Sequence, residues 1–455
     1  MTMGKRESEG FPSVRKSLDL FRKAERLIPG GTQLLSRRPV RFAHGVSPIF
    51  AQRAKGARFW DIDGNEYIDM TMGINSAILG YCDPDVDRAV MEQIKKGTIF
   101  SILHPVEVEL AEELVQVIPC AQMVRFGKSG GEADAVAVRI ARGFTGRDKV
   151  LFCGYHGWHD WYLAANLESP DTLNKHLMPD VPTTGVPRCL RGTAVPFEYN
   201  NLSSLKEALE RNRGEVACVI MEPSRTYLPE KGFLEGVKEL AHKHGALLIF
   251  DEVNTGFRLA LGGAQEFFGV TPDMAVFGKD IANGYPLTAV VGRRDVMEAS
   301  KEMFISSTFW DDNSTIAAGL ACIRKIKAEG VVQHIWKMGE RYVAEMKRLA
   351  CRIGVKAEIT GLPCMTTILF KYGDRSLVNQ LNTLYCQELA RRGIFAGATG
   401  YFVVSFAHKE EEVDKILMAS EETLRVVKKA VDQGSVDGYL KAEQSKPLFD
   451  KRLVR

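Results

Sequence analysis

The chain has 455 residues, of which 45% are hydrophobic and 26% are charged, values typical of a globular protein and unlike those of a disordered chain. Its 60 Lys and Arg against 57 Asp and Glu leave a formal charge of +3, too balanced to indicate a nucleic-acid or membrane partner. No apolar run approaches the roughly 18 to 20 residues that span a bilayer, which argues against an integral membrane protein.

The cysteines and the N-terminus indicate a reduced, cytoplasmic protein. The nine cysteines are scattered and include no Cys-x-x-Cys pair, so neither a disulfide framework nor a zinc ribbon is predicted. The first residues, MTMGKRESEGF, lack the apolar stretch of a secretory signal. We therefore expect the protein to reside in the cytoplasm.

In chain order, the first predicted element is a β-hairpin over residues 57–69, because a turn at Asp63-Gly64 separates two short apolar runs. Six continuous apolar runs follow, typical of parallel strands covered on both faces, and they are Val124–Phe126, Val150–Cys153, Val216–Met221, Ala246–Phe250, Met274–Phe277 and Thr288–Val291. Helical patterns lie between them, such as residues 132–144, where apolar side chains from Ala133 to Phe144 form one stripe. This alternation predicts an α/β protein with a mostly parallel sheet.

The pattern changes after about Phe304. Predicted helices at 316–328, 332–349, 377–392 and 410–428 flank two strand-like runs, Met365–Phe370 and Tyr401–Phe406. We therefore expect a separate α+β domain in the C-terminal part of the chain.

Polar and small residues follow the predicted strands of the large sheet. In open α/β sheets, ligands bind beyond the carboxyl ends of the strands, so these residues are expected at one edge. In chain order they are the loop Lys128-Ser129-Gly130-Gly131 before a helix, Tyr155, Glu222, Asp251 and Lys279.

Each of these features also has an ordinary structural interpretation. Ser129-Gly130-Gly131 alone is a helix N-cap with turn glycines, Asp251 a helix cap and Lys279 a solvated lysine. The Cys153–Asp160 cluster has no second group of ligands, so we expect no metal there. Together, however, an anion-binding helix start, an aromatic ring, an acid and a lysine are the parts needed to hold pyridoxal 5'-phosphate (PLP).

Longer segments carry a family resemblance, and they are FWDIDGNEYIDM, RFGKSGGEADAVAVRIARGFTGRDKV, GYHGWHDW, MEPSRTYLPEKGFLEGVKEL, ALLIFDEVNTGFR and GGAQEFFGVTPDMAVFGKDIANGYPLTAVVGRRDVME. On these motifs, residues 28–427 resemble the class III, fold-type I PLP-dependent aminotransferases, most closely the glutamate-1-semialdehyde 2,1-aminomutase-like branch. The resemblance implies a large PLP-binding α/β domain over residues 76–325, with a mostly parallel seven-stranded sheet. It also implies a smaller α+β domain over residues 326–455, to which an N-terminal segment, residues 1–75, contributes along with dimer contacts.

The resemblance implies roles for individual residues. Lys279 would form a Schiff base with the cofactor aldehyde and act as general acid/base, and Asp251 would pair with the pyridine nitrogen. The other implied cofactor contacts are the phosphate-binding Ser129, Gly130, Gly131 and Thr308, the ring-stacking Tyr155, and His156, Glu222, Val253 and Asn254 around the ring. Thr308 matches a threonine that reaches the phosphate from the neighbouring subunit, which implies a homodimer with active sites at the interface. Candidate substrate contacts are Arg38, Trp158, His159 and Arg225, with Trp158 and Trp161 expected in the core or the pocket wall.

Four departures from the family pattern bear on specificity. Lys128 and Gly131 stand in the usual Asn-Ser-Gly-[Ser/Thr] loop, which removes a hydroxyl donor and adds a cation beside the phosphate. After Thr308, the residues 309–313 (FWDDN) replace a small-residue loop, adding bulk and two negative charges. The segment 30–41 (GGTQLLSRRPVR) differs from that of the aminomutases. Gly400 replaces a glutamate that those enzymes carry, which favours a transaminase over a mutase.

The sequence therefore predicts a biosynthetic PLP-dependent aminotransferase. It would move an amino group from an amino-acid donor, glutamate by family analogy, to a keto or aldehyde acceptor such as a sugar or natural-product intermediate. One alternative is glutamate-1-semialdehyde 2,1-aminomutase. Another, from a different class, is a PLP-binding regulatory module without turnover.

Overall fold

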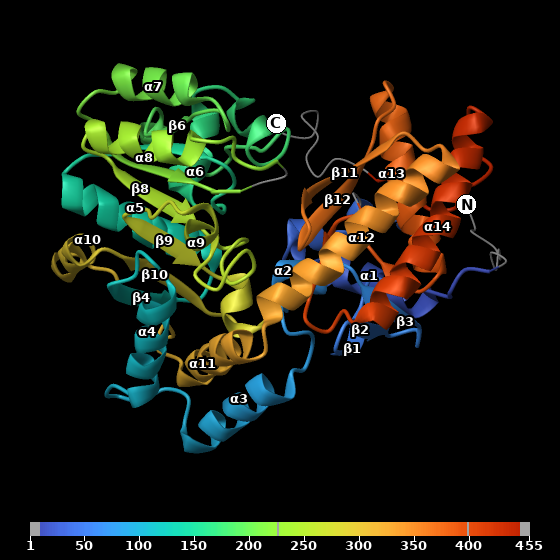
Figure 1. The fold of residues 1–455 in the computed structure, drawn as a ribbon, viewed down its shortest axis with the longest axis horizontal. Helices are drawn as coiled ribbons and strands as arrows, with labels where there is room; N and C mark the ends of the chain where they lie inside the picture. Colours follow the sequence, from blue (N-terminus) through green and yellow to red (C-terminus); the bar gives the residue numbers. More distant parts are fainter. Residues whose placement is uncertain (1–9, 225–226, 398–399, 446–455) are drawn as a thin grey trace. The chain divides into compact units, whose positions relative to one another are not determined.

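A computed structural model describes residues 10–224, 227–397 and 400–445, which form two compact units. Within these described residues, the smaller unit comprises residues 10–74, 78–82 and 333–445, and the larger unit comprises residues 75–77 and 83–332. None of the helices in the described part of the chain is long and apolar enough to cross a membrane. The segments that meet in each unit are far apart in the sequence (Figure 1).

The larger unit contains a seven-stranded sheet with the order β4-β10-β9-β8-β7-β5-β6. Its strands are β4 (Met123–Gly127), β5 (Lys149–Cys153), β6 (Ala194–Pro196), β7 (Val216–Met221), β8 (Leu247–Asp251), β9 (Met274–Phe277) and β10 (Thr288–Gly292). Strand β10 runs antiparallel to both of its neighbours, and the other six strands run in one direction. The carboxyl ends of six strands and the amino end of β10 therefore lie at one edge of the sheet.

Helix α5 (Gly130–Thr145) packs across the centre of this sheet, against β7, β8, β9 and β10. Its apolar side chains meet every second residue of the central strands, because side chains of a strand alternate between the two faces. The buried strand residues in this core are Val150, Phe152, Ala194, Cys218, Ile220, Leu247, Ile249, Met274, Val276 and Val290. This packing fixes the start of α5 at the sheet edge where the strands end.

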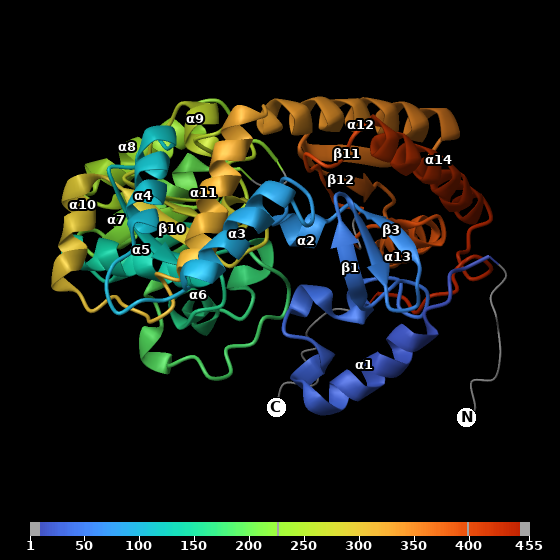
Figure 2. The ribbon, with the colours of Figure 1, turned by 90° about the horizontal axis from the view of Figure 1, so that it is seen from below.

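The other helices of the larger unit surround the sheet (Figure 2). They are α3 (Pro84–Lys96), α4 (Pro105–Val117), α6 (Asp160–Leu163), α7 (Leu202–Arg211), α8 (Phe233–Lys243), α9 (Ala264–Phe268), α10 (Arg294–Glu298) and α11 (Asn313–Ala328). Helix α11 packs against α3, α4 and the short 3₁₀ turn Lys279–Ala282. Helix α11 therefore supports the segment that carries Lys279.

The smaller unit has a four-stranded sheet in the order β1-β2-β3-β13 and a three-stranded sheet in the order β11-β12-β14. Its elements are α1 (Arg15–Leu27), β1 (Ala51–Lys55), β2 (Arg58–Asp61), β3 (Glu66–Asp69), α2 (Met72–Asn75), α12 (Val331–Ile353), β11 (Ala357–Leu362), β12 (Met365–Phe370), α13 (Arg375–Arg391), β13 (Ile394–Phe395), β14 (Phe402–Val403) and α14 (Glu410–Asp432). Figures 1 and 2 show α12 and α14 side by side, and ion pairs such as Arg352–Glu421 join them.

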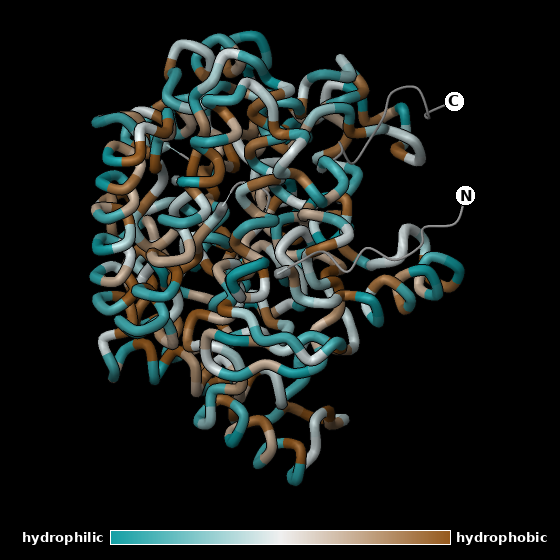
Figure 3. The backbone as a smooth tube through the Cα atoms, turned by 90° about the vertical axis from the view of Figure 1, so that its right-hand side faces the viewer, coloured by the Kyte–Doolittle hydropathy of each residue, from teal (hydrophilic) through white to brown (hydrophobic). Residues whose placement is uncertain are grey.

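The structure confirms the predicted fold class and corrects two details. Strands β7 and β9 have the predicted bounds, and β2 and β3 form the predicted hairpin around Gly64, whose φ of +97° suits a turn glycine. Helices show the alternation of polar and apolar residues that amphipathic packing requires (Figure 3). However, Phe144, predicted on the same apolar stripe as Ala133, is 39% exposed in the last turn of α5. The short β6 was not predicted, since three residues ending in proline carry almost no strand signal.

Candidate active site

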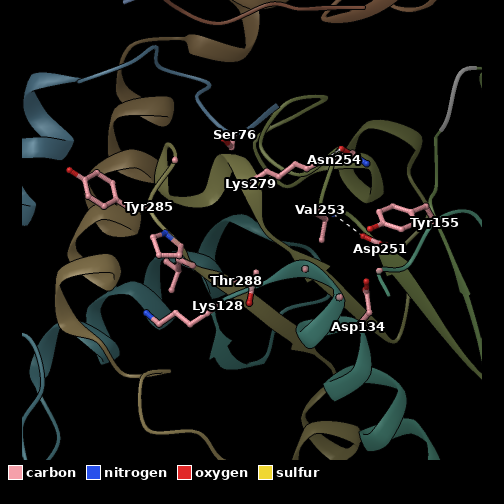
Figure 4. A pocket seen from close by; sticks show the side chains of 16 residues that line it. Ser76, Lys128, Asp134, Tyr155, Asp251, Val253, Asn254, Lys279, Tyr285 and Thr288 are labelled. Atoms are coloured by element: carbon pink, nitrogen blue, oxygen red, sulfur yellow. Dashed lines mark hydrogen bonds between the residues drawn. The ribbon is translucent and has the colours of Figure 1, made fainter. Parts of the chain in front are cut away.

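A cavity of about 320 Å³ opens at the carboxyl edge of the large sheet, entirely within the larger unit. Seven of the predicted site residues line it, and they are Gly130, Gly131, Tyr155, Asp251, Val253, Asn254 and Lys279 (Figure 4). His156 and Glu222 do not line the cavity but form hydrogen bonds to residues that do. The rule that ligands bind beyond the carboxyl ends of the strands in open α/β sheets therefore located the cavity from the sequence.

Asp251 ends β8 as a buried and firmly held carboxylate. His156 Nδ1 lies 2.8 Å from Asp251 Oδ2, and the backbone N–H of Val253 donates to Oδ1 at 3.1 Å. With a carboxylate as the acceptor, the Nδ1 of His156 carries the proton of this hydrogen bond. Both side chains are almost completely buried, so the direction of the Asp251 carboxylate is fixed.

Lys279 begins the 3₁₀ turn that follows β9, and its backbone has a φ of +44°, an unusual value for a residue with a side chain. Its Nζ donates a hydrogen bond to Asn254 Oδ1 (Figure 4). Burial lowers the pKa of Lys279, although the nearby Glu222 and Asp251 carboxyl groups oppose this effect. A lowered pKa raises the fraction of neutral, nucleophilic amine, as a covalent reaction with an aldehyde requires.

Glycines allow a close approach between the start of α5 and the loop after β5. A Cβ added at Gly157, whose φ is +88°, would lie 2.6 Å from Gly131 Cα. A Cβ added at Gly131 would lie 3.2 Å from His159 Nδ1, a buried atom without a hydrogen-bond partner among the described residues. A helix start with free amide groups and a nearby unpaired imidazole nitrogen suits an anion such as phosphate.

Ser129 and Glu132 close the first turn of α5. The Glu132 carboxylate accepts hydrogen bonds from the backbone N–H groups of Lys128 at 2.9 Å and Ser129 at 3.3 Å. Ser129 itself is exposed and does not line the cavity, which Gly130 and Gly131 do.

Two departures from the family pattern meet in space, although they are 184 positions apart in the sequence. Lys128 Nζ donates to Thr315 Oγ1 at 2.5 Å and lies 3.6 Å from Asp312 Oδ2. The additional cation is therefore paired with one of the additional acids. Partial burial lowers the pKa of Lys128, and the Asp312 carboxylate counteracts that change.

Glu222 connects the aromatic side of the site with the lysine side. Its carboxylate accepts hydrogen bonds from the Tyr155 backbone N–H at 3.0 Å and from Asn254 Nδ2 at 3.2 Å. Asn254 in turn accepts from Lys279, so one chain of hydrogen bonds joins Tyr155 to the lysine amine.

Sequence reasoning missed four polar side chains of the cavity, and they are Ser76, Asp134, Tyr285 and Thr288. Thr288 starts β10, pairs with Gly127 at the end of β4, and has a buried hydroxyl without a hydrogen-bond partner among the described residues. It escaped notice because β10 is antiparallel, so its first residue, not its last, lies at the ligand edge. Asp134, on α5, also lines the cavity and points toward Asp251 (Figure 4).

Other predicted residues are not part of this cavity. Trp158 was expected in the core or pocket wall but is 70% exposed and stacks on His159, whereas Trp161 is in the core. Thr308 is exposed and does not line the cavity of this chain. Arg38 lies in the smaller unit, with its guanidinium beside Gly30. Arg225 lies outside the described residues.

The side chains of the Cys153–Asp160 cluster do not form a group of possible metal ligands among the described residues. Among the described residues, the acid and histidine groups whose ligand atoms lie within 4.8 Å of one another are Asp134, His156 and Asp251. His156 Nε2 and Asp134 Oδ1 are buried and have no hydrogen-bond partner among the described residues.

The arrangement has the donors and acceptors that a phosphorylated, aldehyde-bearing pyridine ring needs. The glycines and helix start suit a phosphate, and Tyr155 and Val253 provide apolar surface for a flat ring. Asp251 suits a protonated ring nitrogen, and Lys279 suits the aldehyde.

Comparisons with known proteins agree with this geometry. The family model described as Aminotransferase class-III matches residues 41–424. The chain is 37% identical to a 3-aminobutyryl-CoA aminotransferase of Cloacimonas acidaminovorans, over 91% of this chain and 98% of that protein. It is 35% identical to a glutamate-1-semialdehyde 2,1-aminomutase of Methanosphaera stadtmanae, over 89% and 97% of the two chains. The solved PLP internal aldimine form of the FumI protein of Sphingopyxis sp. MTA144 has a TM-score of 0.85 at 26% identity, covering 96% of this chain and all of that one.

Proposed function

Because the chain belongs to the class-III aminotransferases and is a PLP-dependent enzyme of fold type I, we propose that Lys279 binds the cofactor covalently and Asp251 holds its ring nitrogen. The observation that carries this proposal is their placement in one cavity, at the ends of the adjacent strands β8 and β9. The lowered pKa of Lys279 supports the nucleophilic role.

The remaining cofactor contacts follow from the same cavity. Ser129, Gly130 and Gly131, at the start of α5, hold the phosphate, and the exposed Thr308 reaches the phosphate of a second subunit. Tyr155 and Val253 cover the ring. His156 orients Asp251, and Glu222 and Asn254 hold the side of the ring that carries the hydroxyl group.

PLP, when bound, supplies an aldehyde that joins amines and a ring that withdraws electrons from the attached carbon. Lys279 then holds and transfers a proton at its Nζ, acting as general acid and base at the substrate carbon. Asn254, which accepts a hydrogen bond from this amine, keeps it in position between transfers. Asp251, fixed by His156 and the Val253 amide, keeps the ring nitrogen protonated.

A homodimer with active sites at the interface completes the proposal. Large apolar side chains of the larger unit are exposed, and they include Leu103 (84%), Phe304 (85%) and Phe309 (64%). Exposed apolar side chains of this size suit a protein partner, and Phe309 adjoins Thr308 in the chain. Sedimentation should give a dimer mass, whereas a monomer with full activity would contradict this arrangement.

For substrates, we propose an amino-acid donor, glutamate, and a keto or aldehyde acceptor, which includes sugar and natural-product intermediates. The relative from Cloacimonas supports a 3-oxoacyl compound as the first acceptor to test. The proposed substrate contacts are Arg38, Trp158, His159 and Arg225. The nine cysteines form no disulfide, which suits a cytoplasmic location.

The half-reaction with glutamate tests this function. Holoenzyme mixed with glutamate should lose its visible cofactor absorbance and release one equivalent of 2-oxoglutarate per site. A Lys279→Ala variant should bind PLP but release no 2-oxoglutarate at a comparable rate. Unchanged absorbance with every amino donor would instead indicate a regulatory PLP-binding module.

Glutamate-1-semialdehyde 2,1-aminomutase is the second candidate, favoured by the Methanosphaera relative. Gly400, at a position where that branch carries a glutamate, favours the intermolecular reaction. Incubation with the semialdehyde alone distinguishes the two, since rapid formation of 5-aminolevulinate without another amino donor would establish the mutase.

A further inference from the structure

A second carboxyl group lies beside the proposed ring-nitrogen site. Asp134, the fifth residue of α5, is 2% exposed, lines the cavity and points toward Asp251 (Figure 4). Its Oδ1 has no hydrogen-bond partner among the described residues. Ligand atoms of Asp134, His156 and Asp251 lie within 4.8 Å of one another, so the two carboxyl groups are in close proximity.

Asp134 faces mostly negative or neutral groups. Asp251 comes from the end of β8, Glu222 from the end of β7, Tyr155 and His156 from the loop after β5, and the Lys279 amine follows β9. Burial raises the pKa of Asp134 well above its ordinary value, and the negative charges of Asp251 and Glu222 raise it further. Two buried carboxyl groups this close do not both ionise readily, as in other paired acids.

Because Asp251 is held as an acceptor by His156 and the Val253 amide, the shared proton belongs on Asp134. Building on the proposed role of Asp251, we propose that Asp134 is a positioning residue that donates a hydrogen bond to the Asp251 carboxylate and so sets how strongly that carboxylate holds the proton of the cofactor ring nitrogen.

This role gives two distinct states. While Asp134 keeps its proton, its hydrogen bond draws charge from Asp251 and weakens the pull of Asp251 on the ring-nitrogen proton. When Asp134 loses its proton to solvent, a second negative charge appears at the site and the ring nitrogen holds its proton more strongly. The ring nitrogen therefore keeps its proton, and with it electron withdrawal by the ring, to a higher pH than it would beside an Asp134 that stayed neutral.

The test uses ¹⁵N NMR of holoenzyme reconstituted with PLP that is ¹⁵N-labelled at the ring nitrogen, recorded over a range of pH. Asp134→Asn keeps a neutral donor that cannot ionise, so its ring nitrogen should lose its proton at a lower pH than in the wild type. Asp134→Ala removes the donor, so its ring nitrogen should lose its proton at a higher pH than in the Asp134→Asn variant. Asp148→Asn, an exposed acid beyond the other end of α5, is a control with the same charge change and should leave the signal unchanged.

Coincidence of both Asp134 variants with the wild type at every pH would overturn the proposal. If the apoprotein binds Zn²⁺ and the Asp134→Asn variant does not, the proposal is also overturned, in favour of a metal site. An Asp251→Asn variant separates this inference from the proposed function. If Asp251→Asn moves the signal and the Asp134 variants do not, only the role of Asp134 fails; if Asp251→Asn has no effect, the proposed ring-nitrogen contact fails as well.

Discussion

The buried ion pair between Arg258 and Asp280 holds the segment that carries Lys279. Arg258 is fully buried, and its Nε and Nη2 atoms lie 2.9 and 2.8 Å from Asp280 Oδ2. Asp280 directly follows Lys279, whose positive φ requires support from its surroundings. Removal of one partner leaves an uncompensated buried charge, so Arg258→Met or Asp280→Asn should each lower the free energy of unfolding by about 3–5 kcal/mol.

Urea unfolding of the apoprotein, followed by circular dichroism, measures this effect. An Arg258→Met/Asp280→Leu double variant should recover most of the loss, because apolar replacement of a whole buried pair is often nearly neutral. Glu207→Gln, which breaks the exposed Glu207–Arg211 pair, should cost no more than about 0.5 kcal/mol. Single variants that cost less than about 1 kcal/mol, or a double variant that equals their sum, would refute this reasoning.

Three further predictions concern the surroundings of the site. Burial raises the pKa of Glu252 from its ordinary 4.5 to about 6, so this carboxyl holds its proton more tightly in the folded protein. The protonated Glu252 carboxyl therefore stabilises the folded protein by about 2 kcal/mol below pH 4.5, and this contribution is lost as the pH rises through about 6. Urea unfolding should show that Glu252→Gln lacks this pH dependence. Gly157→Ala should weaken PLP binding about tenfold or more in a fluorescence titration, while Gly214→Ala, with a similar φ of +82° but open space around it, should not; equal effects would point to backbone strain alone. Lys128→Asn and Asp312→Asn should show a coupling of about 0.5–1 kcal/mol in a double-mutant cycle of stability, and strict additivity would contradict their pairing.

The sequence was sufficient for the parts of the site that depend on strand ends. Continuous apolar runs located the parallel strands, and Asp251 and Lys279 follow two of them, so their meeting at one edge needed no structure. Thr288 was missed because the direction of β10 is not visible in its composition. Asp134 was missed because an acid on a helix is ordinarily on the solvent side, and only the packing of α5 turns it toward Asp251.

The sequence also could not predict the ion pair between Lys128 and Asp312 or the exposure of Trp158, for similar reasons. Lys128 and Asp312 were each identified as departures, but no local pattern indicates that residues 184 positions apart form one ion pair. Trp158 was expected in the pocket wall because of its apolar ring, yet the turn at Gly157 directs it outward and leaves it 70% exposed.

The central claim is that Lys279 is the lysine joined to the cofactor, and borohydride reduction of the holoenzyme tests it most directly. After reduction and digestion, mass spectrometry should find the mass of the reduced cofactor on the peptide that contains Lys279, and a Lys279→Arg variant should carry none. Lys128 is the second lysine that lines the cavity, and it should remain unmodified. A reduced cofactor on Lys128, or holoenzyme that binds PLP yet yields no modified Lys279 peptide, would contradict the claim.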